Sequence, residues 1–287
     1  MVRIWGIDRV VRTRNYRTAL DFAAWLDAIA QILELPSRDV LTAVVFPAHI
    51  GSPLFLADEW AAVTKSETVA EAVGWSLFDE KAWLVRHGVG PREGRGQRIA
   101  RAFLARKAPE AAEAYRWAFS EFAARYGVTV VAGSIALPGA DVKDGKITVD
   151  PQARWHEVGA VFGPDGTILP NLYEAGEPAA WARKLFEVSP GKGSMATVTL
   201  ADVQLTATLD EPRRALPGRG VWAWPVTGRI EVSGPEVIVA PALNGQLWEY
   251  EFSGGLTLGG VSGPAFPSGV AGVELDAGGA RYIVSGP

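Results

Sequence analysis

The chain has 287 residues, of which 48% are hydrophobic and 21% charged. This is the composition of a globular protein long enough to bury a large core, so disordered and fibrous classes are excluded. The formal net charge of −4 gives no overall field that would attract nucleic acid or an anionic membrane surface. We therefore expect neither nucleic acid nor a membrane as a partner.

The N-terminal segment and the longest apolar runs indicate where in the cell the protein is expected. Arg3, Asp8 and Arg9 interrupt the first eleven residues, so no continuous apolar core of a signal peptide is present there. The apolar run 237–243 contains Pro241 and is too short to cross a bilayer. These features predict a soluble, cytoplasmic protein.

The sequence contains no cysteine and only three histidines. His49, His87 and His156 are too widely separated to form a local ligand motif. Without thiols, disulfides and thiolate metal sites are excluded. We expect no metal and no cofactor.

The first half of the chain combines helical and strand patterns. Apolar residues spaced three and four apart predict an amphipathic helix over 16–35. The β-branched run 40–46 predicts a strand buried on both faces, followed by a loop at 49–55. Residues 57–124 are mainly helical in pattern, with a Gly- and Arg-rich interruption at 88–96.

The second half is richer in strand patterns. β-Branched and apolar runs predict strands at 128–135, 158–162, 185–188, 195–200, 203–209 and 237–240, and a terminal hairpin from 273–275 and 282–284. We find no internal repeat and no low-complexity linker. Helices interleaved with buried strands indicate a layered α/β fold in a single domain spanning residues 1–287.

Several short segments occur in a distinctive order. They are Phe46-Pro47-Ala48 at a strand end, Gly133-Ser134 after a β-branched run, the turn Gly163-Pro164-Asp165-Gly166, and the stretch from Ser189-Pro190-Gly191 to Thr208-Leu209-Asp210. Their order and spacing resemble those of the carbon–nitrogen hydrolase, or nitrilase, superfamily. The resemblance implies a four-layer α-β-β-α sandwich and, by default, a homodimer.

The resemblance also implies where catalytic groups would stand. In the family a cysteine thiolate attacks an amide or nitrile carbon, a glutamate moves the proton, and a lysine stabilises the oxyanion. These positions are Thr208, Ala48, and Glu174 or its neighbour Tyr173. Ala48 cannot accept a proton and Glu174 would repel an oxyanion. The resemblance thus implies a pseudoenzyme that keeps the scaffold to bind a small-molecule amide or carboxylate, or a protein partner.

Two alternatives stay open. The first is a divergent amide or nitrile hydrolase with Thr208 as nucleophile and Glu174 as base, because burial can raise the pKa of a carboxyl group into the useful range. His49 suits this role less, since it follows Ala48 in a segment expected to be extended, where neighbouring side chains point to opposite faces. The second is a subunit that supports an active relative.

Three further features complete the interpretation. The Gly/Arg-rich segment 88–107 could contact an acidic partner or a phosphorylated metabolite, although a solvated basic helix face explains it more simply. Tryptophans cluster in the second half, and we expect them in the core: Trp155, Trp181, Trp222, Trp224 and Trp248. Relative to the family, the chain carries a helical, Gly/Arg-rich insertion around 57–125 and a shortened C-terminal part.

Overall fold

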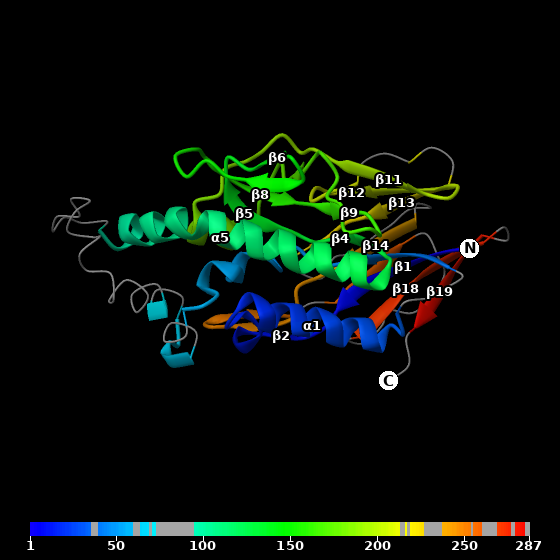
Figure 1. Cartoon of the computed structure of the whole chain (residues 1–287), viewed down its shortest axis with the longest axis horizontal. Coiled ribbons are helices and arrows are strands. Elements are labelled where there is room, and N and C mark those ends of the chain that lie inside the picture. The colour runs from blue at the N-terminus through cyan, green and yellow to red at the C-terminus, as the bar shows by residue number, and fades with distance from the viewer. Residues whose placement is uncertain are drawn as a thin grey trace.

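Two β-sheets packed face to face form the centre of the molecule, and two long helices cover one side of them (Figure 1). The computed structural model describes residues 1–35, 40–59, 64–68, 71–72, 95–212, 216, 219–226, 237–253, 255–259, 269–276 and 279–284. All structural statements below refer to these residues.

The first sheet has six strands in the order β19-β18-β1-β3-β4-β9. They are β1 (Val2–Asp8), β3 (Leu41–Val45), β4 (Thr129–Val131), β9 (Val161–Phe162), β18 (Gly269–Asp276) and β19 (Gly279–Val284). The three central strands, β1, β3 and β4, are parallel. Parallel strands covered on both faces carry near-continuous apolar runs, as the pattern over 40–46 indicates.

The second sheet has five strands in the order β11-β12-β13-β14-β17. They are β11 (Ala196–Leu200), β12 (Val203–Ala207), β13 (Arg219–Ala223), β14 (Val237–Pro241) and β17 (Leu256–Gly259). Along β13, Val221 and Ala223 belong to the core between the sheets, whereas Trp222 belongs to a separate cluster on the outer face. This alternation follows from the two-residue period of a strand.

The core between the sheets requires a close approach at Gly6 of β1. A Cβ atom at Gly6 would overlap the Leu256 side chain and come within 2.9 Å of Val239. Both of those residues belong to the second sheet. Glycine at this position therefore lets the two sheets pack directly against each other.

The two long helices are α1 (Ala19–Ile32) and α5 (Arg95–Tyr126). Helix α1 begins at Thr18, whose hydroxyl accepts the Asp21 N–H, and it buries Phe22 and Leu26. On α5, Phe119 and Phe122 bury their rings in the same apolar cluster. The helix predicted over 16–35 is confirmed, preceded by the 3-10 turn η1 (Thr13–Tyr16).

Smaller elements frame the ends of the main strands. They are β2 (Val11–Arg12), β5 (Ile135–Pro138), β6 (Asp141–Lys143), β7 (Lys146–Thr148), β8 (Trp155–Gly159), β10 (Tyr173–Glu174), β15 (Gly245–Leu247), β16 (Tyr250–Phe252), the 3-10 turn η2 (Ser52–Leu56) and α6 (Ala180–Phe186). The strand predicted at 185–188 was wrong. Helix α6 runs into that segment and ends at Phe186, and the capping residue Glu187 has a left-handed conformation with φ of 52°.

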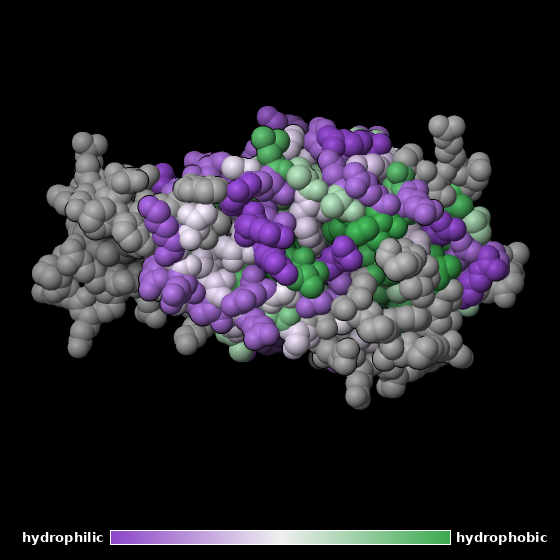
Figure 2. Space-filling view, turned by 90° about the horizontal axis from the view of Figure 1, so that it is seen from below, coloured by the Kyte–Doolittle hydropathy of each residue, from purple (hydrophilic) through white to green (hydrophobic). Residues whose placement is uncertain are grey.

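The outer face of the second sheet differs from that of the first. Its buried residues Trp222, Ile238 and Ala240 pack against Leu216 and Trp224, and no helix of the described ranges contributes to this cluster. None of the described helices is long and apolar enough to cross a membrane. The face seen from below carries hydrophilic side chains next to a group of hydrophobic ones (Figure 2).

Two basic residues of the segment 88–107 are paired with carboxylates, the exposed Arg101 and the buried Lys107. Arg101 on α5 pairs with Glu187 at 3.0 Å, and Lys107 pairs with Glu110 at 2.6 Å and with Glu59 at 3.3 Å. Residues 88–94 of the Gly/Arg-rich segment lie outside the described residues. The tryptophans Trp155, Trp222 and Trp248 are buried, as expected.

Candidate functional site

Ala48 and Thr208 both lie just beyond the ends of parallel strands. Ala48 follows β3 and donates its N–H to the Val226 carbonyl at 3.3 Å, while Thr208 follows β12 and donates its N–H to the Ala223 carbonyl at 3.0 Å. Both acceptors belong to one short segment at the end of β13. The structure therefore brings these two sequence-predicted positions to the same edge of the sandwich.

The Thr208 hydroxyl is engaged in its own turn. Its oxygen donates to the Asp210 carbonyl at 3.2 Å and accepts the Asp210 N–H at 3.1 Å. The Asp210 carboxylate in turn accepts the N–H groups of Gly176, at 2.9 Å, and Glu177, at 3.3 Å. These bonds fix the turn after β12 against the loop after β10, and they leave Thr208 only 3% exposed.

Glu174 is directed to a different partner. Its Oε1 lies 2.9 Å from Nδ1 of His156 on the neighbouring strand β8. Within the described part of the chain, no hydrogen bond or ion pair joins Glu174 to Thr208. The structure thus joins the turn that holds Thr208 to the loop that follows Glu174 without bringing the two functional groups into contact.

Tyr173, the other candidate for the lysine position, belongs to the core. Its hydroxyl donates to the Gly133 carbonyl at 2.6 Å. Burial, together with the neighbouring Tyr115 and Glu157, raises the pKa of Tyr173 well above its ordinary value. The phenol therefore stays neutral and acts as a structural donor.

A buried polar network lies beside Ala48. His49 Nε2 is 3.0 Å from Glu157 Oε2, and His49 Nδ1 is 3.0 Å from the Ser52 hydroxyl. The Ser134 hydroxyl donates to Glu157 Oε1 at 2.7 Å and accepts the His49 backbone N–H at 2.7 Å. These residues come from the segment after β3, from η2, from the β4–β5 connection and from β8, so the network ties four parts of the fold together.

The charge of Glu157 follows from its partners. Burial alone raises the pKa of this carboxyl group, but attraction to His49 and the hydrogen bonds that it accepts outweigh burial and hold the pKa below the ordinary value. Glu157 is therefore ionised.

The local backbone explains how His49 reaches this network. His49 has a φ of 56°, so the chain turns at this residue, and the extended segment expected from the sequence ends before it. Gly133 has a φ of 66°, and a Cβ atom there would overlap the Pro47 carbonyl oxygen. The missing side chain of Gly133 lets residues 47–49 approach Ser134.

Aromatic rings close the network on one side. The Trp181 ring on α6 lies 4.6 Å from the His49 ring in an edge-on arrangement. Trp181 also contacts Tyr250 and Phe252 of β16, with ring centroids 5.8 and 5.4 Å apart. Such packing restricts access to His49 from that side.

The order Ser52, His49, Glu157 has the distances of a hydroxyl–imidazole–carboxylate relay. Two facts argue for a structural role. The Ser52 hydroxyl also accepts the Ala136 N–H at 3.2 Å, and Ser52, His49 and Glu157 are 2%, 0% and 4% exposed. A substrate cannot reach a hydroxyl buried to this extent, so the network stabilises the strand ends.

Sequence reasoning did not identify Glu157 or Ser52. The one local signal was a carboxylate in the middle of a mostly buried strand, Trp155–Gly159, which also contains His156. Because a charged side chain is seldom fully buried without a partner, such a residue indicates a buried pair but not the identity of its partner.

The fold class that these sheets and helices define is that of the nitrilase-like α/β sandwiches, which confirms the expectation from the sequence. No protein-family profile and no curated protein sequence matches the chain, but solved structures do. The NitN amidase from Nesterenkonia sp. AN1 is 13% identical, with 97% of this chain and 94% of that chain covered and a TM-score of 0.51.

Two variants of the Nesterenkonia sp. AN1 amidase give similar values. One, with acrylamide added to its active-site cysteine, is 13% identical over 96% of this chain and 94% of that chain, with a TM-score of 0.51. Another, described as a nitrilase-superfamily amidase, is 12% identical, with 94% of this chain and 88% of that chain covered and a TM-score of 0.49. At this identity the two matches with a TM-score of 0.51 establish the fold alone, and function must be argued from the site.

Proposed function

We propose that this chain is a nitrilase-fold protein without cysteine-dependent hydrolysis of amides or nitriles, and that it uses the scaffold to bind a small amide or carboxylate. The observation that carries the proposal is the engagement of the Thr208 hydroxyl with the Asp210 backbone, while Glu174 pairs with His156. A threonine-based mechanism needs the Thr208 hydroxyl and the Glu174 carboxylate to contact each other, and each of them contacts a different group.

Nucleophilic attack by a hydroxyl requires a base within hydrogen-bond reach. The printed sequence has alanine where the family has its glutamate base, and Thr208 contacts backbone atoms in place of a base. A carboxylate at position 174 would also oppose the negative charge that develops on the substrate oxygen. These points favour binding without turnover over the alternative hydrolase that uses Thr208 and Glu174.

The proposal is tested by following binding and consumption in the same samples. The purified protein is incubated with short amides, N-carbamoyl compounds, nitriles and the matching carboxylates. We expect at least one amide or carboxylate to raise the thermal unfolding midpoint, since a ligand of the folded state stabilises it, while every compound is recovered unchanged. Consumption of a compound, or no stabilisation by any of them, would contradict the proposal.

A further inference from the structure

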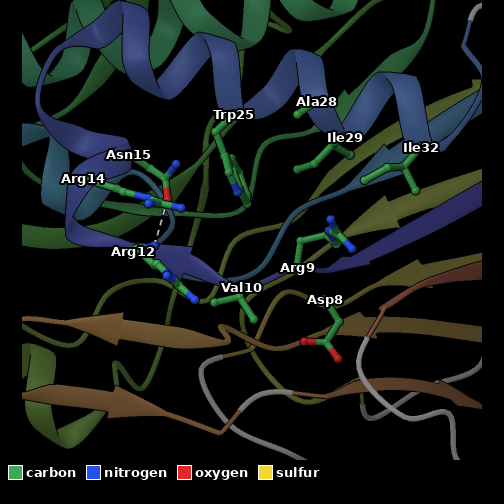
Figure 3. A pocket seen from close by; sticks show the side chains of 10 residues that line it. All are labelled: Asp8, Arg9, Val10, Arg12, Arg14, Asn15, Trp25, Ala28, Ile29 and Ile32. Atoms are coloured by element: carbon green, nitrogen blue, oxygen red, sulfur yellow. Dashed lines mark hydrogen bonds between the residues drawn. The ribbon is translucent and has the colours of Figure 1, made fainter. Parts of the chain in front are cut away.

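A cleft of about 340 Å³ lies between helix α1 and the segment that links β1 to η1. Figure 3 shows Trp25, Ile29 and Ile32 projecting from α1 toward this segment. The Arg14 side chain extends toward Trp25 (Figure 3). The cleft therefore has one largely apolar wall and one wall of polar residues.

The polar wall carries three exposed arginines, Arg9, Arg12 and Arg14. None of them makes an ion pair with any described residue. The nearby carboxylates of α1 are already engaged, Asp21 with Arg17 and Asp27 with Arg125, each at 2.7 Å. The buried carboxylate of Asp8 also lines the cleft, so three guanidinium groups face one carboxylate and leave the cleft with an excess of positive charge.

The backbone that carries these arginines is held in place. The Asn15 side chain accepts the Arg12 backbone N–H at 2.9 Å, the bond drawn in Figure 3. Residues Val11 and Arg12 also pair in parallel with Gly245 and Gln246 of β15. A fixed backbone reduces the entropy that is lost when the side chains order around a ligand.

The apolar wall centres on Trp25, which is half-buried. Its ring packs against Phe22 at 5.9 Å and Phe46 at 6.3 Å, both of which belong to the core. The part of the ring that lines the cleft, together with Ile29 and Ile32, offers an apolar surface opposite the arginines.

We propose that this cleft binds a small planar organic anion, with a carboxylate or phosphate held by the arginines and an aromatic or similarly flat body against Trp25. Guanidinium groups match carboxylate and phosphate oxygens in a two-point geometry, and tryptophan offers a flat apolar face. The cleft volume is within the usual range of small-molecule sites, about 300 to 1,000 Å³. Because Ala48, Glu174 and Thr208 do not line it, this site is independent of the proposed loss of hydrolysis.

Titration calorimetry of the whole chain with benzoate, phenyl phosphate and neutral benzamide tests the proposal. We expect at least one anion to bind about ten-fold or more tightly than benzamide, because the charged hydrogen bonds to arginine are missing in the amide. Binding by benzoate alone or by phenyl phosphate alone would identify the preferred anion. Absence of heat from both anions, or equal binding of benzamide, would overturn the proposal.

Variants locate the site. We expect Arg9→Gln and Arg14→Gln each to weaken binding of the anion by about ten-fold, and Trp25→Leu to weaken it while the chain stays folded by circular dichroism. Arg154→Gln is the matched control, because Arg154 is an exposed arginine without a described ion pair on the loop before β8. An equal loss in Arg154→Gln, or unchanged affinity in Arg9→Gln and Arg14→Gln, would place the anion elsewhere and overturn the proposal.

Discussion

Nε2 of His49 and Oε2 of Glu157 lie 3.0 Å apart, and the two side chains are 0% and 5% exposed. Burying the Glu157 carboxylate costs desolvation free energy, which hydrogen bonds from neighbouring groups offset. The Ser134 hydroxyl donates such a bond to Glu157, and the Ser52 hydroxyl lies 3.0 Å from Nδ1 of His49. Loss of one member therefore leaves its direct neighbours buried with one partner fewer.

Replacing Glu157 should destabilise the fold strongly. We expect Glu157→Ala to lower the free energy of unfolding by about 2 to 6 kcal/mol, since it leaves the Ser134 hydroxyl and Nε2 of His49 buried without their partner and each such group costs about 1 to 3 kcal/mol. Urea denaturation measures the loss. Glu113→Ala is the control, because Glu113 is half exposed in its pair with Arg116 and should contribute less than about 1 kcal/mol. Equal losses in the two variants would argue against a strongly coupled network.

The network should also give a defined pH dependence. The pKa of Glu157 is lower in the folded chain than its ordinary value. The ionised carboxylate therefore stabilises the folded state fully when the pH is above the ordinary pKa, and this stabilisation is lost as the pH falls through the pKa of the folded chain. We expect the difference in unfolding free energy between wild type and Glu157→Gln to become smaller as the pH is lowered over this range. Urea titrations at a series of pH values from neutral downward test this, and a constant or growing difference would contradict it.

Gly133 should tolerate substitution less than another glycine of the same conformation. Gly133 and Gly145 have φ values of 66° and 72°, but a Cβ atom at Gly145 meets nothing within 4 Å, whereas one at Gly133 overlaps the Pro47 carbonyl. We expect Gly145→Ala to cost about 1 to 2 kcal/mol for the left-handed backbone alone. Gly133→Ala should cost clearly more in the same urea measurement. Similar losses would show that Pro47 moves aside easily.

Patterns within single elements were enough to predict α1 and β3, because their apolar spacing reports which faces are covered. Strand β1 was not predicted. Its Arg3 lies in a strand that is otherwise almost wholly buried, and it pairs with Glu274 of β18 at 2.7 Å. That partner is 271 residues away in the chain, so no local pattern could reveal how the charge is accommodated.

Local sequence patterns have the same limit at the candidate functional site. The positions of Ala48 and Thr208 at strand ends follow from segment order, whereas the contact of His49 with Glu157 depends on how β3 and β8 meet in space. Helix α6 has only seven residues, too few to show a helical period. The homodimer, the cytoplasmic location, the single-domain organisation and the roles of Ala48, Glu174 and Thr208 stay predictions.

The central claim is that the Thr208 hydroxyl performs no hydrolysis. The most direct measurement is ammonia release from short amides and nitriles at high substrate concentration, with wild type and Thr208→Ala compared at equal protein concentration. We predict that both release ammonia only at the rate of the buffer blank. Release by the wild type that disappears in a folded Thr208→Ala variant would contradict the account and establish Thr208 as a nucleophile.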